Sequence, residues 1–112
     1  MRYTINMNVN TPDRVFAALA SAPRRQAIAF LAQTALSTSD LALRFGMSAP
    51  AVSRHLSVLQ DAGLVSAERQ GQRVLYRLER DALLAALAGL ASAVDGPLRR
   101  VPPLPRAPRE AI

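Results

Sequence analysis

With 112 residues, half of them hydrophobic, the chain has room for one domain with its own core, and no apolar run in it reaches membrane-spanning length. The formal net charge is +6 and all 14 basic residues are arginine, which favours a polyanionic partner, although genomic base composition also produces arginine-rich chains. The lack of cysteine and the single histidine, His55, exclude disulfides, thiolate metal sites and multi-histidine sites within one chain.

Residues 1–10 alternate between apolar and polar side chains, which is the period of a strand with one buried face. Such an N-terminal arm needs a partner strand within the fold or across a dimer, and the alternative is a frayed terminus. The alternation also differs from the pattern of a signal peptide, so we expect a cytoplasmic protein.

Two helices are predicted next. Thr11 followed by Pro12 and Asp13 is typical of a helix start, because proline suits the first turn and an acid suits the positive end of the helix dipole. This first helix should run to about residue 20, and a second should run from Pro23 through Ala32. The apolar face of the first helix consists of Val15, Phe16 and Leu19.

The spacing of cap residues predicts a helix-turn-helix. Ser37 and Asp40 have the spacing of a capping box, and Gly46 stands where a helix ends with a positive φ. Ser48 then caps the next helix, over residues 48–60, and Pro50 lies in its first turn. The buried stripe of this helix is Val52, Leu56 and Leu59.

The opposite side of the 48–60 helix carries short side chains and one long cation. Ala51, Ser53 and Ser57 are small, and Arg54 is the exception. A helix with an apolar back, a small polar front and one arginine fits the major groove of DNA.

A β-hairpin is predicted after this helix, with strands at residues 64–69 and 73–78 and a turn at 70–72. Arg69 and Arg73 flank its glycine-containing tip and are expected to project to phosphates or into a minor groove. The alternative is an ordinary solvated hairpin tip.

The last helix, over residues 80–94, is more apolar than a small monomer could cover, which predicts a dimer as well as core packing. Residues 96–112 hold five of the eight prolines and are expected to form an extended, flexible tail rich in proline and arginine. We therefore divide the chain into an arm (1–10), a DNA-binding and dimerisation domain (11–95) and the tail (96–112).

The order of these elements resembles the ArsR/SmtB family of winged helix-turn-helix regulators. The motifs that carry the resemblance include Pro50–Leu56, Ala62–Val65 and Gly71–Leu78. The run around Val52 to Leu56, with Ala62–Val65 downstream, is the most specific of them. The resemblance covers about residues 11–94 and implies a mainly α fold with a β-hairpin wing. It also implies a homodimeric transcriptional repressor that pairs through its first and last helices and binds an inverted repeat in double-stranded DNA.

The chain departs from the metal-sensing members of that family. Those members carry thiolates at the start of the helix-turn-helix, or carboxylate and imidazole ligands on the last helix. Here Ser37–Asp40 occupy the first position, and the last helix lacks histidine. Because carboxylates alone bind soft metals poorly, we expect no metal site and no cofactor.

The expected interfaces combine the motif positions with the resemblance. His55 is expected to pack beside the buried stripe or to meet a phosphate. The predicted DNA-binding residues are Thr38, Ser39, Ser48, Ala49, Ala51, Ser53, Arg54, His55, Ser57, Arg69, Gln70, Gln72, Arg73 and Arg77. The predicted dimer residues are Val15, Phe16, Leu19, Leu83, Leu84, Leu87, Leu90 and Val94.

Three alternative functions are compared with this one. An enzyme is disfavoured because the sequence shows no Ser/His/Asp set, metal cluster or phosphate-binding glycine loop. A protein-interaction module is disfavoured by arginines on both the helix front and the hairpin tip. The alternative is a winged-helix regulator with a small-molecule effector, of unnamed identity, in a pocket at the dimer junction.

Overall fold

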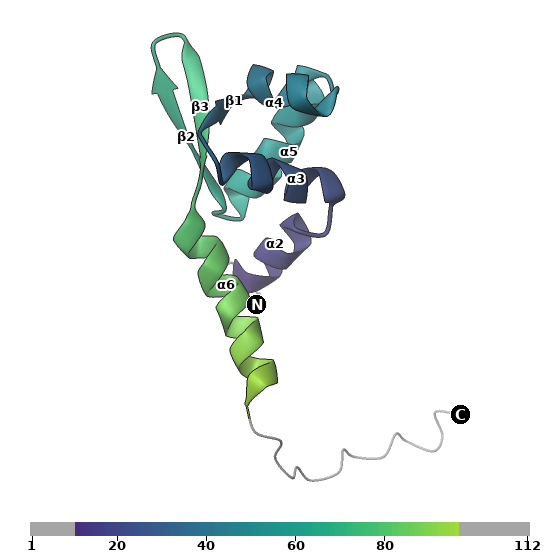
Figure 1. Ribbon diagram of the computed structural model, residues 1–112, viewed down its shortest axis with the longest axis vertical. Helices are drawn as coiled ribbons and strands as arrows, with labels where there is room; N and C mark the ends of the chain where they lie inside the picture. Colours follow the sequence, from purple (N-terminus) through teal and green to yellow (C-terminus); the bar gives the residue numbers. More distant parts are fainter. Residues whose placement is uncertain (1–10, 97–112) are drawn as a thin grey trace, which may run out of the picture.

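The computed structural model describes residues 11–96, so the predicted arm and the predicted tail beyond Gly96 lie outside the described residues. Within them the fold is mainly α with a β-hairpin, as predicted (Figure 1). The helices are α2 (Thr11–Ala18), α3 (Ala22–Leu31), α4 (Thr38–Phe45), α5 (Ala49–Asp61) and α6 (Arg80–Asp95). The strands are β1 (Leu36–Ser37), β2 (Val65–Gln70) and β3 (Arg73–Leu78).

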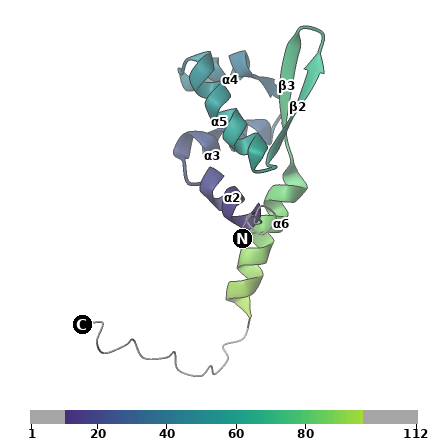
Figure 2. The ribbon, with the colours of Figure 1, turned by 180° about the vertical axis from the view of Figure 1, so that it is seen from behind.

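The hairpin tip and the far end of α6 lie at opposite ends of the described structure. The hairpin tip stands at the same end as α4, whereas α6 leads away at the opposite end, and both views of the ribbon agree on this (Figures 1 and 2). Helix α5 lies in the middle, between α3, α4 and the start of the hairpin. None of the helices in this part of the chain is long and apolar enough to cross a membrane.

Helix α5 supplies much of the core. Val52, Leu56 and Leu59 are at most 2% exposed, which confirms the stripe predicted from their i, i+4, i+7 spacing. They pack with Leu41 of α4 and with Leu64, which follows α5 and is fully buried. The helix is thus fixed on its apolar side, and this leaves its other side to solvent.

Three predicted caps are confirmed. Ser37 and Asp40 form the reciprocal capping box of α4, and Gly46 ends that helix with φ at 66°. The Ser48 hydroxyl accepts a hydrogen bond from the Ala51 N–H at 3.3 Å. These caps satisfy backbone groups that have no partner within the helices, and they set the short turn between α4 and α5.

The first two helices differ slightly from their predicted bounds. Helix α2 ends at Ala18, and arginines of α3 bind the carbonyl oxygens at this end. Arg24 donates to those of Ala17 and Ala18, and Arg25 donates to that of Leu19. Helix α3 begins at Ala22, one residue before Pro23, because the Ser21 hydroxyl caps it.

The sheet has three antiparallel strands in the order β1-β3-β2. The hairpin is confirmed, but its last pair is Gln70 with Arg73, so the turn has two residues rather than three. Gly71 takes φ at 65°, and no residue other than glycine in the described range has a positive φ, which is the pattern of a type II′ turn. Strand β1 was not predicted; it places Leu36 opposite Tyr76 and Ser37 opposite Leu75.

Candidate nucleic-acid interface

Helix α5 presents the predicted small, polar face to solvent. Ala49, Ser53, Arg54 and Ser57 are exposed, as is the cap residue Ser48, and Ala51 is half-buried. This follows from the helical period, since the residues between the buried positions 52, 56 and 59 fall on the other side. The face is therefore accessible and free of bulky apolar groups.

Arg54 is the long cation on this face. It is exposed, and within residues 11–96 its guanidinium makes no hydrogen bond or ion pair. Because its backbone belongs to a helix anchored in the core, the side chain starts from a fixed position while its donors remain available. This is a suitable arrangement for reading a base edge.

His55 lies at the edge of the buried stripe. It is half-buried, and its Nδ1 is 3.5 Å from Nη1 of Arg24 on α3. Arginine only donates, so a neutral ring with an unprotonated Nδ1 suits this contact. The same arginine donates from Nε to the Ala18 carbonyl oxygen at 2.6 Å, so His55 belongs to a network joining α2, α3 and α5.

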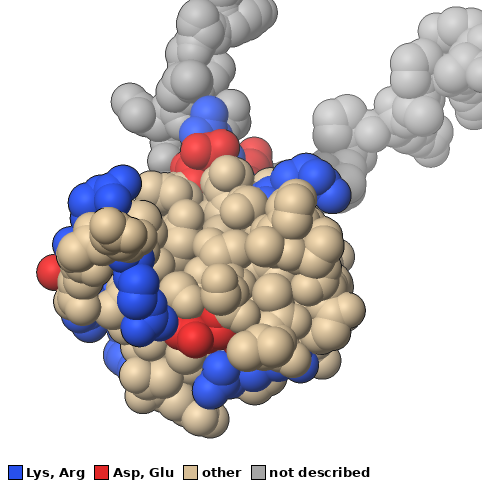
Figure 3. Space-filling model, turned by 90° about the horizontal axis from the view of Figure 1, so that it is seen from above, with Lys and Arg blue, Asp and Glu red and all other residues tan. Residues whose placement is uncertain are grey.

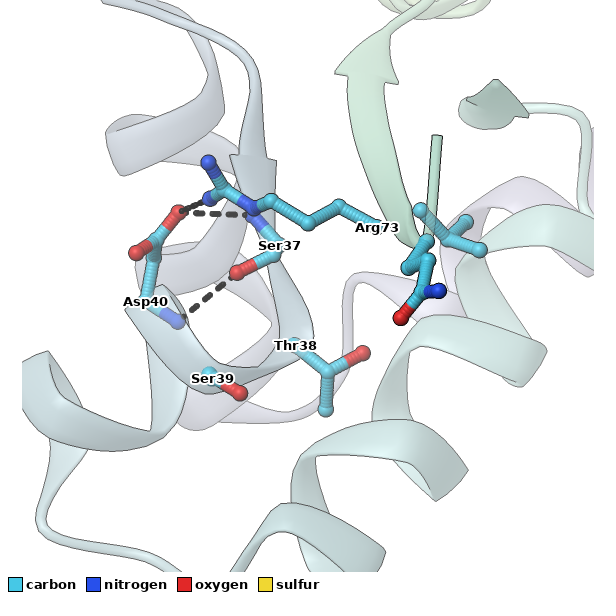
Figure 4. A pocket seen from close by; sticks show the side chains of 7 residues that line it. Ser37, Thr38, Ser39, Asp40 and Arg73 are labelled. Atoms are coloured by element: carbon cyan, nitrogen blue, oxygen red, sulfur yellow. Dashed lines mark hydrogen bonds and ion pairs between the residues drawn. The ribbon is translucent and has the colours of Figure 1, made fainter. Parts of the chain in front are cut away.

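The start of α4 and the hairpin tip enclose a groove of about 510 Å³ (Figure 4). It brings together two sets of predicted DNA-binding residues that are more than thirty positions apart in the chain. Thr38 and Ser39 lie on the α4 side, and Gln72 and Arg73 lie on the hairpin side. The remaining lining residues are Ser37, Asp40 and Val74.

The hairpin arginines have partners within the protein. Arg73 donates from Nη2 to Oδ2 of Asp40 at 2.9 Å, across the groove, instead of projecting freely from the tip. Arg77 pairs with Glu68 on the neighbouring strand at 3.0 Å. Among the described residues, Arg69 contacts only the Gly71 carbonyl oxygen, at 3.5 Å, and Gln70 and Gln72 are exposed.

Asp40 is the functional-site residue that the sequence did not indicate beyond its capping role. The backbone N–H of Ser37 donates a hydrogen bond to the Asp40 carboxylate, and the Ser37 hydroxyl forms a second hydrogen bond with Asp40. These two contacts lower the pKa of Asp40 below its usual range. Burial opposes these hydrogen bonds, and the positive charges of Arg73 and Arg44 lower the pKa by smaller amounts than the Ser37 contacts do. A charged carboxylate therefore lies beside the wing arginine.

The end of the molecule that carries the hairpin tip has a mixed surface. Figure 3 looks onto this end and shows arginine side chains over the hairpin and around the rim, with a mostly uncharged middle and a small acidic patch beside the arginines. An uncharged centre with cations around it suits a surface that meets bases in the centre and phosphates at the edges.

The predicted dimer residues fall into two groups. Leu84, Leu87, Leu90 and Val94 of α6 are 42–77% exposed, and α6 has no buried residue. By contrast, Val15 is only 3% exposed and already lies in the core of the single chain, so a partner could cover little of it. The other predicted positions, Phe16, Leu19 and Leu83, are half-buried. Of these, Leu19 and Leu83 pack against that core.

No group of three or more His, Cys, Asp or Glu side chains is placed to hold a metal ion within residues 11–96. Of the carboxylates in this range, Asp40 and Glu68 are paired with arginines.

Comparison with known proteins identifies the family. The model of the bacterial regulatory protein arsR family matches residues 22–67, which include α3, α4 and α5. The chain is 38% identical over 96 residues to the HTH-type transcriptional regulator Rv2034 of Mycobacterium tuberculosis, covering 76% of this chain and 90% of that protein. It is 32% identical over 71 residues to the transcriptional repressor SdpR of Bacillus subtilis, covering 63% and 79%. Several other curated regulators are matched over only about half of their own length.

Solved structures give the same result. The solution structure of the homodimeric winged helix-turn-helix DNA-binding domain of Mb0332 from Mycobacterium bovis, a possible ArsR-family regulator, superposes with a TM-score of 0.66 at 28% identity. That match covers 85% of this chain and 92% of the Mb0332 domain. The chain therefore belongs to the ArsR family of bacterial regulatory proteins and is a winged helix-turn-helix transcriptional regulator.

Proposed function

We propose that this regulator is a repressor that binds an inverted-repeat operator as a homodimer, with residues 11–95 as its DNA-binding and dimerisation domain. The observation that carries the proposal is the exposed face of α5, on which Arg54 has no partner in the described part of the chain. The function of SdpR as a repressor and the homodimeric state of Mb0332 support it.

In the proposed complex, the two copies of α5 enter successive major grooves about 34 Å apart. Arg54 donates to a guanine edge, Ser53 to any of several base edges, and Ala49 and Ala51 contact thymine methyl groups. Each copy reads one half-site, so the two-fold symmetry of the protein matches the symmetry of the operator.

Phosphate contacts surround these base contacts. Ser48 and the free N–H groups at the start of α5 suit one phosphate, because the helix dipole favours an anion there. Further phosphate contacts are assigned to Thr38, Ser39, His55, Ser57, Arg69, Gln70, Gln72, Arg73 and Arg77. These contacts hold the register of α5 on the duplex but carry no sequence information themselves.

The exposed leucines of α6 support the dimer. Leu84, Leu87 and Leu90 are each about half exposed, and burying such side chains is worth on the order of 1 kcal/mol each at this degree of exposure. A dimer bound at the promoter would exclude the polymerase. This proposed mechanism takes place in the cytoplasm and needs no enzymatic step, no metal and no cofactor.

The test is selection of bound duplexes from a random library or from genomic fragments, followed by the mass of the complex in solution. The expected result is a palindromic consensus bound by two chains. Retention of all duplexes without a consensus, or binding by a single chain, would contradict the proposal.

A second candidate is a regulator released by a small apolar molecule at the junction of α2 and α6. It is favoured by a groove of about 430 Å³ between these helices, lined by Pro12, Val15, Ala62, Gly63 and three alanines of α6. An apolar fluorescent dye that binds the dimer and is excluded by Ala82→Met would support this candidate. If the dimer binds no dye, the second candidate is contradicted and the repressor without a small-molecule ligand stands.

A further inference from the structure

The outer half of the hairpin has little support from the rest of the protein. Along β2 only Val65 is buried and Ser66 half-buried, and the four residues toward the tip are exposed. Strand β1 holds β3 only at Leu75 and Tyr76. Within the described residues, the bond from Arg73 to Asp40 is the one hydrogen bond or ion pair that joins residues 69–73 to an element outside the hairpin.

Asp40 is a rigid anchor for that bond. Its Oδ2 accepts both the Ser37 N–H at 3.0 Å and the Arg73 Nη2–H at 2.9 Å, and its own N–H donates to the Ser37 hydroxyl at 3.1 Å (Figure 4). The next residue, Leu41, is fully buried. The carboxylate is therefore fixed relative to α4 by backbone hydrogen bonds and, through the core, relative to α5.

Arg73 is held at one corner only. Its side chain is 60% exposed, and Nη1 and Nε make no hydrogen bond in the described part of the chain. A guanidinium has five donors in a rigid fork, so fixing one nitrogen orients the others without consuming them. The remaining edge is open to an anion that approaches the groove from solvent.

We propose that Asp40 is a specificity-determining positioning residue of the DNA interface, which fixes Arg73 at one place relative to α5. This inference rests on the proposed function. An untethered arginine reaches the nearest phosphate of any duplex and adds equally to all sequences. A tethered arginine makes a good contact only where the duplex backbone follows one path, and that path depends on sequence through groove width and bending.

The inference predicts that Asp40→Asn changes the affinity for two kinds of DNA by different factors. Removing a negative charge beside a polyanion should strengthen binding to random-sequence duplexes. Releasing Arg73 should at the same time lower the ratio of operator affinity to random-duplex affinity, about three- to tenfold for the dimer, given the usual strength of exposed ion pairs. Loss of simple charge repulsion alone would strengthen binding to both duplexes by the same factor.

The experiment measures both affinities at one salt concentration, with the selected operator and a random duplex of equal length. Ser37→Ala is the matched control, because it removes the cap hydroxyl but keeps the backbone N–H of residue 37 that holds the Asp40 carboxylate, and with it the Asp40–Arg73 pair. Its ratio should be unchanged. In an Arg73→Gln background, Asp40→Asn should no longer change the ratio, as expected for a residue that acts through Arg73. An unchanged ratio for Asp40→Asn, or an equal fall in the Arg73→Gln background, would overturn the inference.

A measurement on the free wild-type protein does not depend on any variant folding. The Nε–H group of Arg73 should show restricted motion by NMR relaxation, in contrast to that of Arg69, which has only a 3.5 Å contact within the hairpin. Equal mobility of the two groups would overturn the inference. If wild-type protein selects no preferred sequence but Arg73 is restricted, the proposed function fails instead.

Discussion

Arg54 and Arg73 are both exposed arginines, but different interactions constrain them. In the described part of the chain, Arg54 is constrained only through its backbone, which belongs to a helix packed into the core. Arg73 stands on a poorly supported hairpin and is held through its guanidinium by Asp40. An arginine on a fixed helix needs no second anchor to arrive at the same base pair each time. An arginine on a hairpin tip does, because small changes in the hairpin move the tip by much more.

Replacing Arg54 with alanine tests the base-reading role. If the guanidinium binds a guanine edge, Arg54→Ala should weaken operator binding by about 1–3 kcal/mol per half-site and relax the preference at that base pair. Binding measured on a panel of single-base operator variants gives both values. An equal loss on every duplex would instead place Arg54 on the phosphate backbone.

We expect the ionisation of Asp40 to contribute to the pH dependence of the free energy of unfolding. Its pKa in the folded protein is lowered by the Ser37 hydrogen bonds and by nearby arginines, so the unfolded chain binds its proton more readily. The resulting stabilisation is present above about pH 4, the range of an unfolded aspartate, and is lost as the pH falls through the lower folded value.

Urea unfolding as a function of pH, for the wild type and for Asp40→Asn, checks this. The free energy of unfolding of the wild type should fall more steeply below about pH 4 than that of the variant. Parallel curves for the two proteins down to about pH 2 would contradict the prediction.

At the scale of elements, the turn between α4 and α5 depends on one backbone conformation. Gly46 takes φ at 66°, and a side chain added there would meet nothing within 4 Å. The cost of Gly46→Ala is therefore backbone strain alone, and we expect a loss of about 1 kcal/mol in the free energy of unfolding.

Gly89 provides the matched comparison. It lies inside α6 with ordinary helical geometry, and an added Cβ there also meets nothing within 4 Å of the single chain. Gly89→Ala should therefore stabilise the protein by up to about 1 kcal/mol, as in other helix interiors. Thermal or urea unfolding measures both variants, and a loss at Gly89 would mean that another chain packs closely there.

In the whole molecule, α6 extends away from the winged half (Figure 2). Its residues Leu84, Leu87 and Leu90 are exposed. An aspartate at Leu87 would place a charge in the proposed dimer interface, which is costly without a partner. Leu87→Asp should give monomers by analytical ultracentrifugation and lose operator binding at least tenfold.

Leu43 is the control for oligomeric state, since it is 83% exposed on α4 at the opposite end of the molecule. Leu43→Asp should leave the dimer intact. Dimers of Leu87→Asp that still bind the operator would remove α6 from the interface.

The salt dependence of DNA binding is a property of the whole dimer, because its slope depends on the total number of phosphate contacts that both chains make. Arg73→Ala should reduce the slope of log K against log salt by about one unit per subunit. Arg80→Ala is the charge-matched control, since Arg80 binds the Ala32 carbonyl oxygen near the foot of the hairpin, and the slope should stay as in the wild type. An unchanged slope for Arg73→Ala would remove the wing tip from the interface.

Local signals predicted most of the elements well. The caps Ser37, Gly46 and Ser48 and the stripe of α5 are short-range patterns, and each was found as expected. Strand β1 was missed because two residues carry no periodicity; it exists only because β3 offers an unpaired edge at Leu75 and Tyr76. The bond from Arg73 to Asp40 was missed for a similar reason, since it joins residues 33 positions apart.

The helix-turn-helix and the hairpin could be predicted from the amino-acid sequence, because they depend on side-chain periodicity and on residues that cap or turn the backbone within a few positions. The family was indicated by the resemblance of the Pro50–Leu56 and Ala62–Val65 motifs. The tertiary structure decided which charged groups meet. It left Arg54 without a partner in the described residues, placed Arg73 against Asp40, and placed Val15 in the core of the single chain. The physical reason is that ion pairs and burial depend on the distance between atoms of different elements, which is set only when those elements pack around a common core.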